Sequence, residues 1–128
     1  MQLDLTPLER AFLDALLASE APPTWKAALA QQFAALSAIQ REHTVVGFYS
    51  RLKLNAAVCP QLPGAPADTH WFAAGGCHAE VTGVDLGLTM ILWSQGGYID
   101  CIEGVSYGDG ADLNPDLFAL RPVSIQLN

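Results

Sequence analysis

Residues 86–103 read LGLTMILWSQGGYIDCIE, and the hydrophobic pattern of this stretch decides the fold. Its first half is apolar on both faces of an extended chain, with Leu88, Met90 and Leu92 on one face and Ile91 and Trp93 on the other. The Gly-Gly pair that follows supplies the positive φ angles of a tight turn, and the second half returns antiparallel. The stretch therefore predicts a central β-hairpin that is covered by helices on one face and by other groups on the opposite face.

Two helices are predicted upstream of this hairpin. Thr6, Pro7 and Glu9 form a capping-box start for a helix over about residues 6–19. A second helix is predicted over about residues 24–40, with Thr24 as its cap after a Pro-Pro turn. Both helices carry an apolar stripe at helical spacing, made of Leu8, Phe12, Leu13, Leu16 and Leu17 in the first and of Trp25, Leu29, Phe33 and Leu36 in the second.

The hydrophobic period changes to that of strands after residue 43. Strands are predicted over residues 44–54, within residues 70–82, through the hairpin, and finally near residues 120–127. The chain of 128 residues suits one domain over residues 1–128. We expect an α+β fold in which two N-terminal helices pack on one face of an antiparallel sheet of about five strands.

The distribution of charge carries more information than the net charge of −7. From Leu54 to Leu120 the chain has no Lys or Arg, while eight acidic residues fall in this stretch: Asp68, Glu80, Asp85, Asp100, Glu103, Asp109, Asp112 and Asp116. Such a surface would repel nucleic-acid phosphates and attract a basic protein partner. The alternative is that acidity only keeps an apolar protein in solution, since 51% of its residues are hydrophobic and 15% are charged. This shortage of charge also makes a homo-oligomer plausible.

Neither a membrane nor a secretion signal is indicated by the sequence. No apolar run approaches the roughly 20 residues of a membrane span. The N-terminus has acidic residues early and no basic region before an apolar stretch, so it does not resemble a signal peptide. We therefore expect a cytoplasmic protein without membrane contact.

No motif for a metal, a cofactor or a catalytic centre is found. Three cysteines without a CxxC pair predict reduced thiols, neither a disulfide nor a metal site. The Gly-rich stretches lack phosphate-binding patterns, so no cofactor is expected. Strict alternation along the second hairpin strand would place Asp100 and Glu103 on opposite faces, which disfavours a pair of carboxylates acting on one bond. A bulge at Gly104 is the alternative that would rotate Glu103 back. Catalysis by Cys and His stays open without positive support, and no catalytic residue is assigned.

The candidate binding residues lie at the end of the hairpin and in the loop after it. They are Glu103, Tyr107, Asp109 and Asp112. A loop flanked by glycines can present side chains outward without breaking the sheet. Tyrosine is favoured where a contact must be both apolar and hydrogen-bonding, so this tip is typical of a recognition surface.

Three segments of the chain resemble a family of small bacterial proteins without an established activity. They are TPLERAFLDALL, REHTVVGFYSRLKL and GLTMILWSQGGYIDCIEGVSYGDG. Members of the family end in a strand, a Gly turn, a strand and the pattern LEG-x-x-YG, which residues 102–108 match with Ile in place of Leu. The resemblance covers nearly the whole chain and implies a fold rather than an activity. Some small acidic α+β proteins of this kind resemble immunity proteins of bacterial toxin systems, by analogy alone.

Three functions are compatible with these features. The first is a non-enzymatic acidic protein that engages a basic partner, with a toxin domain as one candidate. The second is a small-molecule binding domain or small enzyme with a pocket between sheet and loops, in which Glu103, Tyr107 and a histidine are the polar groups. The third is a homo-oligomeric scaffold.

Overall fold

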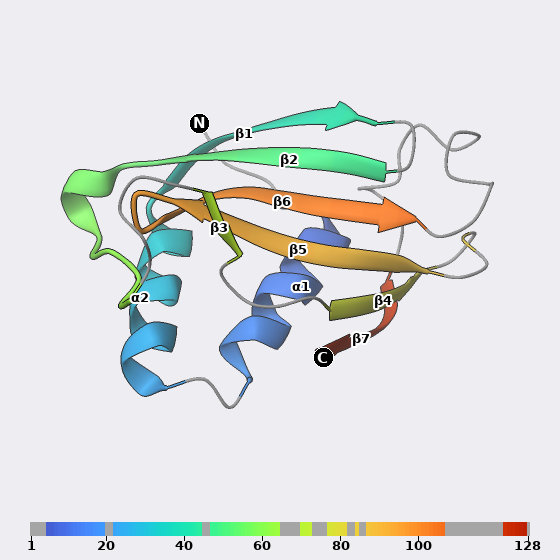
Figure 1. Cartoon of the computed structure of the whole chain (residues 1–128), viewed down its shortest axis with the longest axis horizontal. Coiled ribbons are helices and arrows are strands. Elements are labelled where there is room, and N and C mark those ends of the chain that lie inside the picture. Colours follow the sequence, from blue (N-terminus) through green and yellow to red (C-terminus); the bar gives the residue numbers. More distant parts are fainter. Residues whose placement is uncertain are drawn as a thin grey trace.

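The computed structural model describes residues 5–19, 22–44, 47–64, 70–72, 77–81, 84, 87–106 and 122–127, and its elements form an α+β fold (Figure 1). The helices are α1 (Pro7–Leu17), α2 (Pro23–Ala34) and the short 3-10 helix η1 (Ala56–Val58). The strands are β1 (Leu36–His43), β2 (Gly47–Leu54), β3 (His70–Phe72), β4 (Cys77–Val81), β5 (Leu88–Gln95), β6 (Tyr98–Ser106) and β7 (Pro122–Leu127). They pair antiparallel in one sheet in the order β1-β2-β6-β5-β4-β7, with β3 also paired to β5.

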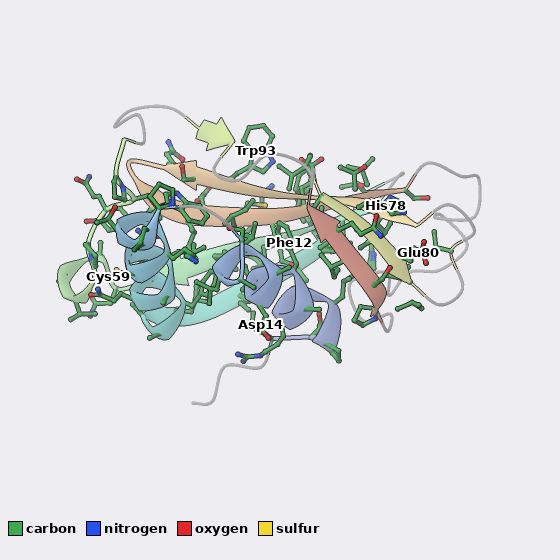
Figure 2. The ribbon with its side chains drawn as sticks, turned by 90° about the horizontal axis from the view of Figure 1, so that it is seen from below. Phe12, Asp14, Cys59, His78, Glu80 and Trp93 are labelled. Carbon is green, nitrogen blue, oxygen red and sulfur yellow. The ribbon has the colours of Figure 1, made fainter. Side chains whose placement is uncertain are left out.

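The β5–β6 hairpin lies at the centre of the sheet, as its two-sided hydrophobic pattern predicts. Residues Leu88, Met90 and Leu92 are fully buried, and they belong to one core cluster with the apolar stripe of α1 and with Leu29 of α2. Gly96 and Gly97 make the turn with φ angles of 63° and 83°. The predicted arrangement of two helices on one face of an antiparallel sheet is therefore confirmed. Figure 2 shows Phe12 between α1 and the sheet, while Trp93 projects from the opposite side.

The predicted second helix is too long. The helix α2 ends at Ala34, and the residues from Leu36 onward form β1, which pairs with β2 along its whole length. Leu36 and Ile39 are three residues apart, which is the spacing of an apolar stripe on a helix. In β1 both residues still pack against the core, because a register shift occurs between Leu36 and Ala38. Pairing with β2 thus overrides the local helix pattern. The sheet has seven strands where about five were predicted, and β1 is a strand that the sequence did not predict. The strand β2 begins at Gly47 rather than at residue 44.

The start of α1 is anchored to the sheet by one buried carboxylate. Glu9 completes the capping box with Thr6, as predicted, because the Thr6 amide donates to Glu9 Oε1 at 2.8 Å and the Glu9 amide donates to Thr6 Oγ1 at 3.2 Å. The same carboxylate accepts two hydrogen bonds from the Arg41 guanidinium of β1, at 2.9 and 2.6 Å, and one from Ser50 Oγ of β2 at 2.5 Å. The side chain of Glu9 is fully buried, so this network fixes α1 against the first two strands.

The second helix is held to the hairpin by a buried amide. Gln32 Nε2 donates to the carbonyls of Pro60 and Gly97 at 2.8 and 3.0 Å, and its Oε1 accepts from the Ile99 amide at 2.8 Å. The helix α2 begins at Pro23 with Pro22 in the capping position, so Thr24 is not the cap that the sequence predicts. The turn of the central hairpin is consequently positioned by α2 and by the segment that follows η1.

Candidate functional site

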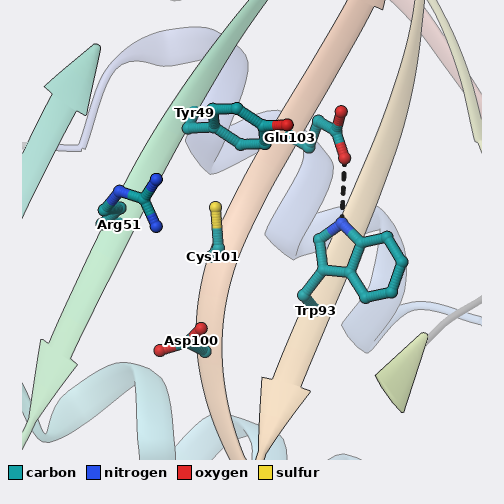
Figure 3. A pocket seen from close by; sticks show the side chains of 6 residues that line it. All are labelled: Tyr49, Arg51, Trp93, Asp100, Cys101 and Glu103. Carbon is teal, nitrogen blue, oxygen red and sulfur yellow. Dashed lines mark hydrogen bonds between the residues drawn. The ribbon is translucent and has the colours of Figure 1, made fainter. Parts of the chain in front are cut away.

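The face of the sheet opposite to the helices carries a pocket of about 300 Å³ on strands β2, β5 and β6. Its walls combine two carboxylates, one guanidinium, one thiol and two aromatic rings. Figure 3 shows the residues that line it: Tyr49, Arg51, Trp93, Asp100, Cys101 and Glu103. These residues come from β2 and from the β5–β6 hairpin, which is distant from β2 in sequence but lies beside it because β2 pairs with β6.

A β-bulge in β6 brings both carboxylates to this pocket. Trp93 pairs with Cys101 and Ser94 pairs with Ile99, which leaves Asp100 as the extra residue between two ladder pairs. The prediction that Asp100 and Glu103 point to opposite faces is therefore wrong, because strict alternation ends at the extra residue. Asp100, Cys101 and Glu103 all line the pocket, whereas Ile99 and Ile102 are buried in the core.

Glu103 is the residue that joins the two aromatic walls. Its Oε1 accepts a hydrogen bond from Trp93 Nε1 at 3.0 Å, and the Tyr49 hydroxyl points toward the same carboxylate (Figure 3). The negative charge of Glu103 is the largest cause that raises the pKa of Tyr49, followed by burial of the phenol. Tyr49 therefore stays protonated at neutral pH, and the pocket keeps a neutral phenol beside an anionic carboxylate.

Arg51 forms the positive border of the pocket on β2. Its guanidinium carbon lies 5.4 Å from the centroid of the Tyr49 ring, and its Nη2 donates to Glu42 Oε1 of β1 at 2.9 Å. The two side chains of this ion pair are 55% and 50% exposed, so the pair contributes little to stability. The hydrogen bond to Glu42 raises the pKa of Arg51 further, and the group remains a cation.

Cys101 lies at the floor of the pocket as a protonated thiol. Burial raises its pKa to about 12, and it raises the pKa of Cys77 in the core to about 12 as well. A thiol with such a pKa is a poor nucleophile at neutral pH, because the thiolate is the reactive form. Within the part of the chain that the structure describes, no three His, Cys, Asp or Glu side chains come together as a metal site.

One of the four predicted binding residues lies in the described part of the chain. Glu103 lines the pocket, while Tyr107, Asp109 and Asp112 lie outside the described residues. The sequence alone missed the contributions of Tyr49 and Arg51, because they depend on the non-local pairing of β2 with β6, and it placed Trp93 on the face opposite to Leu92 without assigning it to a pocket. It also missed Asp100, for which a signal existed: Ile99 and Ile102 are three residues apart, a spacing that two core positions of one strand take only across a bulge.

Comparison with known proteins adds no relative to this description. No family model, curated protein or solved structure matches the chain. The family resemblance of the three segments therefore stays a prediction. Among the described helices, none is long and apolar enough to cross a membrane.

Proposed function

We propose that this protein is a non-enzymatic binding protein that engages a basic protein partner through the open face of its sheet. The observation that carries the proposal is the pocket of Tyr49, Trp93, Asp100 and Glu103 on that face. In this proposal a Lys or Arg side chain of the partner enters the pocket. The proposal keeps Tyr107, Asp109 and Asp112 as predicted binding residues from the sequence, and a toxin domain is one partner of this chemistry.

The composition of the pocket favours a cation over an anion. Two carboxylates and one guanidinium line the pocket, so its net charge is negative, and Arg51 is also ion-paired with Glu42 of β1. The Trp93 indole donates its N–H to Glu103, which leaves the ring system as an apolar wall. Aromatic walls with carboxylates are the groups that hold an alkyl chain with a cationic end, because the ring stabilises the charge by roughly 0.5–1 kcal/mol at exposed sites.

The charge pattern of the chain supports the same partner. Asp100 and Glu103 belong to the stretch from Leu54 to Leu120, which has eight acidic residues and no basic one. A net negative potential speeds the encounter with a basic partner, and salt screens it. The association rate should therefore fall steeply as the salt concentration rises.

Matched neutral substitutions test the proposal with a fluorescein-labelled peptide of sequence GRGRGRG as the basic probe. Glu103→Gln should weaken binding roughly two- to fivefold, the size of one partly exposed charge contact. Glu80→Gln makes the same chemical change at an exposed position of β4 and should leave binding unchanged. Asp100→Asn and Asp14→Asn form a second pair, since Asp14 is exposed on α1, away from the pocket (Figure 2).

Equal weakening in all four variants would contradict the proposal. If all four variants weaken binding by the same factor, the peptide responds to overall acidity, and the solubility interpretation of the charge holds instead. Equal melting temperatures of the variants exclude unfolding as the cause of a lost signal.

A small-molecule site is the second candidate, and the juxtaposition of Arg51 with two carboxylates favours it. A zwitterion of amino-acid type could place its carboxylate at Arg51 and its ammonium at Asp100 or Glu103. The volume of about 300 Å³ is at the lower end of ligand pockets. Under this alternative, free amino acids would bind more tightly than the peptide, and Arg51→Gln would abolish their binding.

A further inference from the structure

Arg51 lies between two sets of carboxylates on the open face of the sheet. Its strand, β2, has β1 on one side and β6 on the other. On the β1 side, Arg51 Nη2 donates to Glu42 Oε1 at 2.9 Å. On the β6 side, Arg51 pairs in register with Cys101 and shares the pocket with Asp100 and Glu103. The guanidinium therefore lines the pocket while it is bonded to a carboxylate outside the pocket.

Sheet geometry explains why Glu42 can hold this side chain. In the ladder of β1 with β2, Glu42 faces Tyr49, so it is diagonal to Arg51, two residues farther along β2. Diagonal neighbours of an antiparallel pair are roughly 7–8 Å apart, which long side chains bridge. The guanidinium carbon also lies 5.4 Å from the centroid of the Tyr49 ring. A resident cation thus lies against one aromatic wall of the pocket.

Packing alone does not fix the position of Arg51. Its side chain and that of Glu42 are both about half exposed. An exposed ion pair of this kind contributes little free energy, so other carboxylates compete with it for the guanidinium. Asp100 acts on Arg51 in the same direction as Glu42, since each of the two negative charges raises the pKa of the guanidinium. Arg51 is therefore attracted from both sides, and the hydrogen bond to Glu42 holds it at the border.

We propose that Arg51 sets the specificity of the pocket for cations and that Glu42 is the positioning residue that keeps it at the border. While Arg51 is bonded to Glu42, a Lys or Arg side chain of the partner can approach Asp100 and Glu103. Without Glu42, the guanidinium of Arg51 turns to these two carboxylates and competes with the partner's cation. The inference rests on the proposed function and adds two residues that control affinity, one of which lies outside the pocket.

The two candidate ligands of the pocket have opposite requirements at Arg51. The resident guanidinium repels a basic side chain, so the removal of Arg51 should strengthen the binding of a basic peptide. A zwitterion of amino-acid type would instead use the guanidinium for its carboxylate, so the same change should abolish its binding. The sign of the effect of Arg51→Gln therefore distinguishes the two classes of ligand.

A double-mutant cycle tests the coupling between Glu42 and Arg51. The probe is the fluorescein-labelled peptide GRGRGRG. Glu42→Gln alone should weaken binding about two- to threefold, and Arg51→Gln alone should strengthen it about two- to fivefold, which are the effects of exposed charge contacts. In the Arg51→Gln background, Glu42→Gln should leave binding unchanged, because no guanidinium is left to be held.

Matched controls separate positioning from overall charge. Glu80→Gln removes an exposed carboxylate of β4, and Arg10→Gln removes an exposed guanidinium of α1. Neither control should change the binding of the peptide. If net charge alone acted, Glu80→Gln would weaken binding as much as Glu42→Gln does, and this result would overturn the inference.

The NMR signal of the Trp93 indole N–H reports the position of Arg51 without a ligand. This N–H donates to Glu103 Oε1, so a guanidinium that reaches the carboxylate changes its chemical shift. Glu42→Gln should move the signal in the direction in which the peptide moves it in the wild-type protein. In the Arg51→Gln background, Glu42→Gln should not move it. A signal that Glu42→Gln leaves unchanged in the otherwise wild-type protein would show that Arg51 stays at the border, against the inference.

The outcomes separate this inference from the proposed function. If the wild-type protein does not bind GRGRGRG, the proposed function is overturned and this inference with it. If the peptide binds but Glu42→Gln weakens binding equally with and without Arg51, Glu42 acts through its own charge, and only the inference is overturned. If Arg51→Gln weakens the binding of the peptide, the resident guanidinium is not a competitor, and the inference is overturned as well.

Discussion

The two faces of the sheet hold similar polar groups in opposite states. On the helix side, Glu9, Arg41 and Ser50 form a closed network in which the carboxylate is fully buried. On the open side, Glu103 and Arg51 have aromatic neighbours and accessible surface. A closed, desolvated network positions secondary structure, whereas an open one keeps its charges available for another molecule. The comparison teaches that the same residue types serve the fold on one face and suit recognition on the other.

The largest expected difference between the faces is in stability. Glu9→Ala leaves Arg41 without its partner and removes half of the capping box, so unfolding should become easier by about 3–5 kcal/mol. Glu103→Ala is the matched change on the open face and should cost about 1 kcal/mol or less, as one partly exposed hydrogen bond is lost. Urea denaturation of both variants measures the difference. Equal losses would mean that Glu103 is as structural as Glu9, and would remove the main support for the binding site.

A loss of stability of intermediate size is expected at high pH, and its cause is the burial of two thiols. Cys77 and Cys101 have pKa values raised from 9.0 to about 12 in the folded protein. Above pH 9 the unfolded chain loses these protons while the folded protein keeps them, so stability is complete below pH 9 and is lost as the pH rises toward 12. Tyr49, with its raised pKa, adds a loss of the same sign above pH 10.

Denaturation midpoints across this pH range distinguish the two cysteines. Burial is the main cause of the raised pKa at both thiols, but only Cys101 also has charged neighbours: Arg51 lowers its pKa, whereas Asp100 and Glu103 raise it. Cys101→Ala and Cys77→Ala should each reduce the alkaline slope. Added salt screens the charges that act on Cys101 and should leave the contribution of Cys77 unchanged, because no charged group acts on Cys77. A slope that neither substitution alters would show that other groups cause the alkaline loss.

The helix side could be predicted from local patterns, and the open side could not. The capping box at Thr6 and the apolar face of β5 depend on residues close in sequence, and both are confirmed. The strand β1 was missed because Leu36 continues the spacing of the helix before it, and only pairing with β2 selects the extended form. The pocket was missed because it requires β6 between β2 and β5 and an extra residue at Asp100. Register and bulges are properties of a pair of strands. The sequence of one strand alone specifies them only weakly.

The smallest expected effect concerns a polar group on the helix side that has no partner. Ser94 lies on the core face of β5, next to the bulge, and its side chain is fully buried. Its Oγ is the only buried side-chain nitrogen or oxygen among the described residues without a hydrogen-bond partner. A buried hydroxyl without a hydrogen bond is unfavourable, and an alanine fits the same space, so Ser94→Ala should stabilise the protein by about 0.5–1 kcal/mol.

Ser50→Ala is the matched control on the same side of the sheet, because it removes a hydroxyl that donates to Glu9 and should destabilise. If the helix side of the sheet tolerates polar groups only within its closed network, the free energies of unfolding measured by urea denaturation should shift in opposite directions in the two variants. A loss of stability in Ser94→Ala would instead mean that the hydroxyl has a partner, such as a bound water, and that the inner face is less dry than the Glu9 network indicates.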